Sequence, residues 1–446
     1  MLDTYQLNLA GLVLACGVLL AWPSSSPKTS RKSPRKPGAK AKTAGKASQW
    51  AFFTVYALVM ASDWLQGPFL YSLYKTDHAV PSHIIPRLFT TGFLSGALTA
   101  PFIGSLADRH GRRSACLVFC LASAASCLLT AFGPSLPLLF LGRALGGFAT
   151  SLLFSVFESW MVTDFGNRRL AEKGGDLSRT FGLMSTVNSV VAIVSGVASE
   201  WLVGVAGSAK APFAASAAIV AIASLFISTQ WDENYGSTGQ AAAAPGSSAK
   251  DNKTATPSLW STLTSKGVLA LALATTTFEG SMYLFVVLWA PLLQSASAAP
   301  ESLPYGLIFA AFMSTTLLSS LLYPRLSRGA APSNVLSAVL ALSAAIFLVL
   351  SSSSGPGASE QRVFWLFCIF EAAVGAYFPA AGVLKGSVVP DGVRAQVYAA
   401  LRVPLNAFVV LSLILMGEGT ADAAATVFGL CGALLLGGAG AVWVVG

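Results

Sequence analysis

The chain has 446 residues, of which 54% are hydrophobic and 11% are charged, and its mean hydropathy is +0.66. Because a soluble domain carries roughly 25% charged residues, this composition excludes a soluble globular protein and predicts an all-α polytopic membrane protein. The formal net charge is +9, and eight positive residues with no acid among them fall between positions 28 and 46. The basic character is therefore local.

Thirteen apolar windows approach or exceed the length of about 20 residues that a helix needs to cross a bilayer. They lie near residues 5–22, 50–72, 87–107, 114–133, 136–158, 181–203, 211–229, 266–292, 303–323, 333–351, 363–385, 397–416 and 423–445. Positive charge follows the first window instead of preceding it, and Ala21-Trp22-Pro23 is a poor cleavage site for a signal peptide. We therefore predict one retained leading helix and twelve core helices.

The basic segment, residues 28–46, lies between the first two windows and contains Ser, Pro and Gly but no aromatic residue. Nucleic-acid binding is not expected, because no side chain there stacks on bases. The segment is predicted to lie on anionic lipid at the cytosolic surface. The N-terminus is then outside the cell, residues 104–113, residues 230–265 and the C-terminus are cytosolic, and Asn252, in the single N-x-[ST] sequence, stays unglycosylated.

The third and fourth windows are joined by the decamer Gly104-Ser-Leu-Ala-Asp108-Arg109-His110-Gly111-Arg112-Arg113. It resembles G-x-x-x-D-R-x-G-R-R, the loop signature of the major facilitator superfamily. The glycines are expected to allow a tight turn and close helix approach, and Asp108 to hydrogen-bond a helix N-terminus. The resemblance implies a cytosolic gate containing Gly104, Asp108, Arg109, Gly111 and Arg112. It further implies that Glu158 or Asp164 pairs with Arg112.

The same resemblance implies two lobes of six helices each. We predict an N-terminal helix with its basic segment (residues 1–48), an N-terminal lobe (49–230), a cytosolic linker (231–265) and a C-terminal lobe (266–446). The middle of the linker is rich in Gly, Ser, Ala and Thr, a composition typical of flexible linkers.

Five ionisable residues lie deep inside predicted core helices: Asp63, Arg143, Glu279, Glu371 and Arg402. Each costs about 2.5–3.5 kcal/mol or more at a helix centre and persists mainly where it faces a cavity or a partner. Arg143 and Arg402 form a candidate substrate-binding pair for an anion, because a guanidinium stays charged and offers forked donors to oxyanion oxygens. Four of the five fall on the helices that line the central cavity in the superfamily, which is an implication of the resemblance and not of the pattern.

The alternative is that each arginine is neutralised by a carboxylate and holds helices together. Arg143 would then pair with Asp63 or Glu371, and Arg402 with Glu279 or Glu371. The three carboxylates are also candidates for proton coupling. Asn188 and Asn406 are further candidate substrate contacts, and packing between helices is the alternative for both.

No cofactor or metal site is expected. The six cysteines lie inside apolar runs, and the three histidines lie in loops. The sequence contains no phosphate-binding loop of the form GxxxxGK[ST] and no catalytic triad in a plausible site. Neither ATP-driven transport nor an enzymatic reaction is expected.

Longer runs narrow the resemblance. They include Asp63-Trp64-Leu65-Gln66-x-Pro68, Gly142-Arg143-Ala144-Leu145-Gly146-Gly147, Phe154-Ser155-x-Phe157-Glu158-x-Trp160, Trp231-x-Glu233-Asn234-Tyr235 and Arg402-Val403-Pro404-Leu405. Together they resemble the eukaryotic molybdate-anion transporter family over nearly the whole chain. The resemblance implies import of molybdate, a tetrahedral dianion, across the plasma membrane, with proton coupling left open. Two alternatives remain: a facilitator for a sugar or an organic anion, and a transport-inactive sensor or scaffold.

Overall fold

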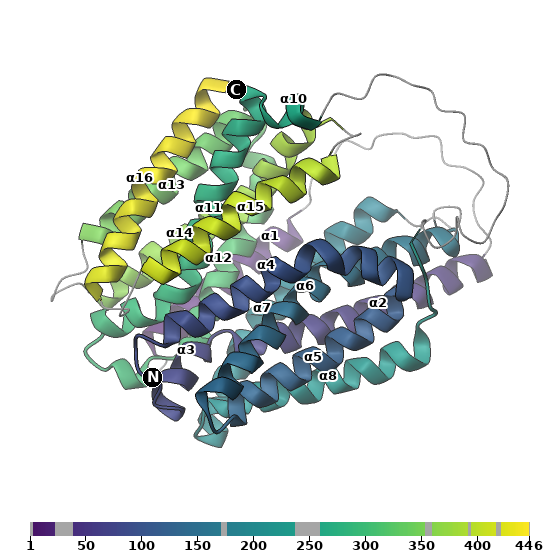
Figure 1. Cartoon of the computed structure of the whole chain (residues 1–446), viewed down its shortest axis with the longest axis horizontal. Helices are drawn as coiled ribbons and strands as arrows, with labels where there is room; N and C mark the ends of the chain where they lie inside the picture. Colours follow the sequence, from purple (N-terminus) through teal and green to yellow (C-terminus); the bar gives the residue numbers. More distant parts are fainter. Residues whose placement is uncertain are drawn as a thin grey trace. The chain divides into compact units, whose positions relative to one another are not determined.

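A computed structural model describes residues 3–22, 39–170, 176–236, 259–352, 359–390, 394–415 and 421–445 (Figure 1). In these ranges the chain forms helices and short connections, without a strand. Asn252 and residues 28–38 of the basic segment lie outside the described residues, so the predictions made for them remain predictions.

The described part of the chain contains thirteen long helices, which correspond in order to the thirteen predicted windows. They are α1 (Thr4–Ala21), α2 (Ala39–Gln66), α4 (Ile85–His110), α5 (Arg112–Phe132), α6 (Leu136–Asn167), α7 (Leu177–Ala206), α8 (Lys210–Gln230), α11 (Lys266–Ala296), α12 (Tyr305–Leu326), α13 (Pro332–Ser352), α14 (Glu360–Val388), α15 (Arg394–Leu415) and α16 (Ala421–Val445). Four short elements lie between them: α3 (Leu70–Ser72), the π-helix η1 (Leu73–Asp77), α10 (Leu259–Leu263) and the 3-10 helix η2 (Pro300–Ser302).

Eleven of the long helices have both the length and the apolar composition needed to cross a membrane. The other two, α2 and α4, span 28 and 26 residues but carry more polar residues. A helix satisfies its backbone hydrogen bonds internally, which is what a bilayer requires of a spanning segment. The chain is therefore an integral, all-α membrane protein, as predicted.

The helices form two compact units. The N-terminal unit comprises Trp22–Leu73 and Thr91–Ala249, and the C-terminal unit comprises Met1–Ala21, Tyr74–Thr90 and Lys250–Gly446. Residues 74–90 thus group with the C-terminal helices, although the sequence-based domain scheme placed them in the first lobe. Windows of hydropathy assign a segment to its neighbours along the chain, whereas contacts in space decide which unit it joins.

The leading helix α1 also belongs to the C-terminal unit, where it packs against α12. The hydroxyl of Tyr5 donates a 2.5 Å hydrogen bond to Glu360 at the start of α14, and the Tyr5 ring lies edge-on to Phe364 with centroids 5.1 Å apart. Farther along α1, the Cys16 thiol donates to the carbonyl of Ser314 on α12 at 3.3 Å. These contacts make α1 part of a helical unit and not a separate anchor.

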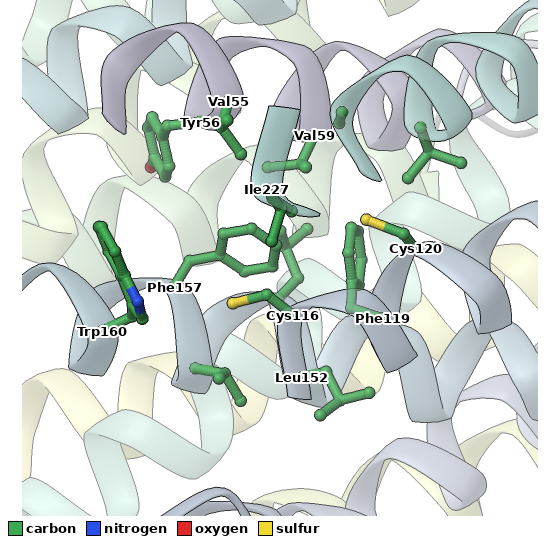
Figure 2. Close-up of a cluster of buried hydrophobic side chains, with 14 of the residues drawn as sticks. Val55, Tyr56, Val59, Cys116, Phe119, Cys120, Leu152, Phe157, Trp160 and Ile227 are labelled. Carbon is green, nitrogen blue, oxygen red and sulfur yellow. The ribbon is translucent and has the colours of Figure 1, made fainter. Parts of the chain in front are cut away.

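The core of the N-terminal unit forms where α2, α5, α6 and α8 meet (Figure 2). Val55 and Val59, one turn apart on α2, point into this core, and Phe119 on α5 meets Phe157 on α6 edge to face with centroids 5.2 Å apart. Cys116 lies among these side chains, and all six cysteines of the chain are buried and free. Inside a bilayer there is no hydrophobic driving force between helices, so close packing of this kind holds them together.

Candidate transport site

Two charged residues of the N-terminal unit, Asp63 on α2 and Arg143 on α6, interact electrostatically. Both lie within membrane-length helices, and both residues are half-buried. Such charges are stable beside a partner or a hydrated cavity. Asp63 and Glu371 were the predicted acidic partners of Arg143, and Asp63 interacts with it electrostatically.

Close contact between α4 and α6 positions the Arg143 side chain. A Cβ on Gly147 would collide with the carbonyl oxygen of Gly92, so the two helices meet backbone to backbone. The hydroxyl of Ser151 on α6 donates to the carbonyl of Gly96 on α4 at 2.8 Å and fixes this contact. A Cβ on Gly92 would lie 2.7 Å from Nη2 of Arg143. Gly92 thus provides the space for the guanidinium, a role that sequence reasoning missed because one glycine among 41 carries no distinguishing signal.

Asn188 on α7 accepts a 2.8 Å hydrogen bond from the indole Nε1 of Trp64, the residue after Asp63. This hydrogen bond links α7 to α2 and orients the Asn188 amide. It corresponds to the packing role that the sequence analysis gave as the alternative to substrate contact. Contact of Asn188 with substrate remains a prediction. Asn406 lies half-buried on α15, one turn after Arg402, and its role also remains a prediction.

In the C-terminal unit, Glu279 on α11 meets two residues of α14. Its Oε1 atom lies 3.5 Å from Nζ of Lys385 and accepts a 3.0 Å hydrogen bond from the hydroxyl of Tyr377. The Tyr377 ring is stacked on Phe278 with centroids 3.9 Å apart, which fixes the direction of its hydroxyl. Glu279 therefore pairs with Lys385, which the sequence analysis did not select because the predicted window ended at residue 385. Helix α14 continues to Val388 and so keeps Lys385 in its last turn.

Glu371, also on α14, is buried with 6% of its surface exposed. Its Oε2 atom accepts a 2.9 Å hydrogen bond from the Thr316 hydroxyl on α12, and a Cβ on Gly375 would collide with the Thr316 carbonyl oxygen. The close approach of α12 and α14 thus brings a neutral hydroxyl to this carboxyl group. A carboxyl group buried beside a hydroxyl is costly to keep charged, which suits a group that binds and releases a proton.

Arg402 is exposed on α15 and acts electrostatically on Tyr283 of α11. The acids proposed to neutralise it have other partners: Glu279 is paired with Lys385, and Glu371 with Thr316. Within the described residues of the C-terminal unit, Arg402 forms no ion pair. Neither predicted acidic partner thus forms an ion pair with Arg402 in this part of the chain, and a role of its guanidinium in anion binding remains a prediction.

The decamer forms a one-residue turn, with α4 ending at His110 and α5 beginning at Arg112. The residue between them, Gly111, has a φ of 103°, and a Cβ there would lie 2.5 Å from the carboxylate carbon of Glu233. Glu233 caps α5 by accepting from the backbone nitrogens of Arg113 and Ser114 at 2.7 and 3.1 Å. An acid does occupy a helix N-terminus here, where the helix dipole favours it, but it is Glu233 and not Asp108.

The other decamer residues differ in their surroundings. Asp108 accepts from Nε of Arg112 at 2.8 Å, one helical turn away. A Cβ on Gly104 would meet nothing nearer than the Ser155 hydroxyl at 3.9 Å, so the close approach expected at this glycine is absent. Arg109 is exposed.

The predicted pair between Glu158 and Arg112 is not formed. Besides Asp108, the Arg112 side chain donates to the carbonyl of Ser159 at 3.0 Å and to the hydroxyl of Thr163. Glu158 is exposed on α6. Successive residues of a helix point about 100° apart, so the face of α6 that carries Thr163 turns Glu158 away from Arg112. The other predicted partner, Asp164, pairs with Arg168 at 2.6 Å.

Proteins with similar sequences cover almost the whole chain. A molybdate-anion transporter of Takifugu rubripes is 31% identical over 438 residues, covering 91% of this chain and 88% of its own, and one of Danio rerio is 33% identical over 403 residues, covering 84% and 81%. The chain belongs to the molybdate-anion transporter family. Residues 5–361 also match a family profile described as sugar transporters with twelve transmembrane segments.

Solved transporter structures share the fold of this chain at low sequence identity. The crystal structure of the nucleoside transporter NupG superposes with a TM-score of 0.62 at 15% identity, covering 89% of this chain and 98% of its own. A peptide transporter in complex with sulfate gives 0.69 at 12% identity, covering 89% and 94%. The chain is therefore a membrane transporter and not an enzyme, in agreement with the resemblance found in the sequence.

Proposed function

We propose that this chain imports molybdate, or a similar tetrahedral oxyanion, by alternating access. Support comes from relatives named molybdate-anion transporter, which match at 30–33% identity over most of the chain. We place the activity in the plasma membrane with the N-terminus outside and the C-terminus in the cytosol, because the basic segment and the decamer arginines favour the cytosolic side.

The observation that carries this proposal is the positive charge that Arg402 retains. Glu279 and Glu371 are engaged by Lys385 and Thr316, and neither forms an ion pair with Arg402 in the described part of the C-terminal unit. A binding site that contains an intramembrane cation without an acidic ion-pair partner is better suited to an anionic solute than to a sugar. In the N-terminal unit, Arg143 supplies a second guanidinium, which Gly92 positions.

Two further parts of the mechanism belong to the proposal. The decamer residues Asp108 and Arg112, with Thr163 on α6, form the cytosolic gate and bias the conformational equilibrium without touching substrate. Import is coupled to protons through the intramembrane carboxylates. Along the sequence, the proposed lobes are residues 49–230 and 266–446, joined by the linker 231–265, although residues 74–90 group with the C-terminal helices.

The test is uptake of radiolabelled molybdate by cells that express the chain, normalised to surface protein, with sulfate as competitor. Arg143→Lys and Arg402→Lys should impair uptake, because a point charge cannot reproduce a forked contact, and the alanine variants should abolish it. Arg169→Lys, an exposed arginine after α6, is the matched control and should transport normally.

Full molybdate uptake by Arg143→Ala and Arg402→Ala would refute the role of the two arginines. Uptake of a labelled sugar but not of molybdate by the unmodified protein would replace the proposed substrate. Absence of uptake for either solute at normal surface abundance would favour a sensor or scaffold.

A further inference from the structure

The C-terminal unit contains a cationic cluster, defined as Glu279, Tyr283, Tyr377, Lys385 and Arg402. Its one ion pair is loose: Nζ of Lys385 and Oε1 of Glu279 are 3.5 Å apart, whereas a strong charge-assisted hydrogen bond measures about 2.7–2.9 Å. The side chains of Lys385 and Glu279 are 24% and 16% exposed, so neither is sealed among the helices. The pair is thus built to open more readily than a sealed ion pair.

The charges of the cluster do not balance. Lys385 and Arg402 carry two positive charges and Glu279 carries one negative charge, so the empty cluster has an excess of one positive charge. A bound tetrahedral dianion would convert this into an excess of one negative charge. Protonation of Glu279 would restore neutrality, which is the favoured state where water is scarce.

We propose that Lys385 is a further oxyanion-binding residue. In the empty protein, Glu279 takes the place of the oxyanion as the partner of Lys385. This inference rests on the proposed anion transport. When the dianion binds, an N–H of Lys385 donates to an oxyanion oxygen instead of to Glu279. The released carboxylate takes up one proton from the solution on the side of entry. When the anion leaves, Glu279 returns that proton to water and pairs with Lys385 again, so each dianion travels with one proton on this residue.

The surroundings of Glu279 favour it over the other carboxylates for this step. It meets Tyr377 and Lys385 of α14, and it acts electrostatically on Tyr283 of its own helix, as does Arg402 of α15. Helix α16 also packs on α11, and its Cys431 thiol interacts with Ser281 of α11. Glu371 is bonded to Thr316 and has no cation to exchange for a substrate in the described part of the unit. Of Glu279 and Glu371, Glu279 is the one with a cationic partner among the described residues of this unit.

Proton uptake on anion binding gives a direct test. The purified full chain is titrated with sodium molybdate by calorimetry in two buffers of different ionisation enthalpy, which gives the number of protons taken up per anion bound. We expect about one proton for the unmodified protein and about none for Glu279→Gln, with the affinity of that variant retained or increased. Asp232→Asn, which alters an exposed carboxylate outside the C-terminal unit, is the control and should still take up the proton.

A second comparison isolates Lys385. The double variant Glu279→Gln/Lys385→Gln removes both charges of the ion pair together, so it should fold, and it should bind molybdate about ten- to a hundredfold more weakly than Glu279→Gln alone. Lys266→Gln in the Glu279→Gln background, an exposed lysine at the start of α11, should not change the affinity.

The outcomes separate this inference from the proposed function. Molybdate binding without proton uptake, uptake that persists in Glu279→Gln, or equal affinities of the double and single variants would each refute the inference and leave anion transport intact. Failure of the unmodified protein to bind molybdate would refute both.

Discussion

Replacing Gly92 with alanine should weaken substrate binding while leaving the protein folded. The added Cβ would lie 2.7 Å from Nη2 and 3.3 Å from Cζ of Arg143, against a favourable separation of about 3.5–4.0 Å. The backbone of α4 cannot retreat easily, because it touches α6 at Gly147 and is held by the bond from Ser151 to Gly96. The guanidinium, at the free end of a flexible side chain, must therefore move by roughly 1 Å.

Such a shift would cost a charged hydrogen bond to the substrate, worth about 1.5–3 kcal/mol. The apparent affinity for molybdate should fall by about tenfold to about 150-fold. The assay is concentration-dependent molybdate uptake normalised to surface protein, together with thermal unfolding in detergent. Gly104→Ala, on the same helix, is the control, since its Cβ would come no nearer than 3.9 Å to Ser155. Unchanged affinity in Gly92→Ala, or a loss explained wholly by reduced folded protein, would refute the reasoning.

Three further predictions concern the gate and the topology. Gly111→Ala should lower the thermal stability, since a φ of 103° costs a residue with a Cβ about 1–3 kcal/mol and the new atom would displace Glu233, whereas Gly104→Ala should not; equal melting temperatures would contradict this. Arg112→Ala should reduce the transport rate several-fold at unchanged surface abundance, because a conformational bias is lost and not a ligand; wild-type uptake would show that the decamer only orients the chain. Asn252 should carry no glycan when the protein is treated with a glycosidase and its mobility compared, and a shift in mobility would invert the proposed orientation.

Much of the fold can be predicted from local patterns. Hydropathy along the chain located all thirteen long helices, because a segment must be apolar over its whole length to cross a bilayer. The decamer indicated the superfamily, and the rarity of intramembrane charge singled out Asp63, Arg143 and Arg402. Each of these signals lies in residues that are close in sequence, so it can be recognised without knowledge of the tertiary structure.

Which side chains meet was decided by the tertiary structure. Lys385 at the end of its window, and not Arg402, pairs with Glu279, and Glu233 far along the chain caps the helix that begins at Arg112. Glu158, one residue from the carbonyl that Arg112 contacts, points away from it. The physical reason is that pairing depends on the rotation and depth of each helix, which backbone contacts such as that between α4 and α6 at Gly92 determine. The sequence by itself determined that this chain spans a membrane and carries charge inside it, and the packing of its helices decided which of those charges form ion pairs.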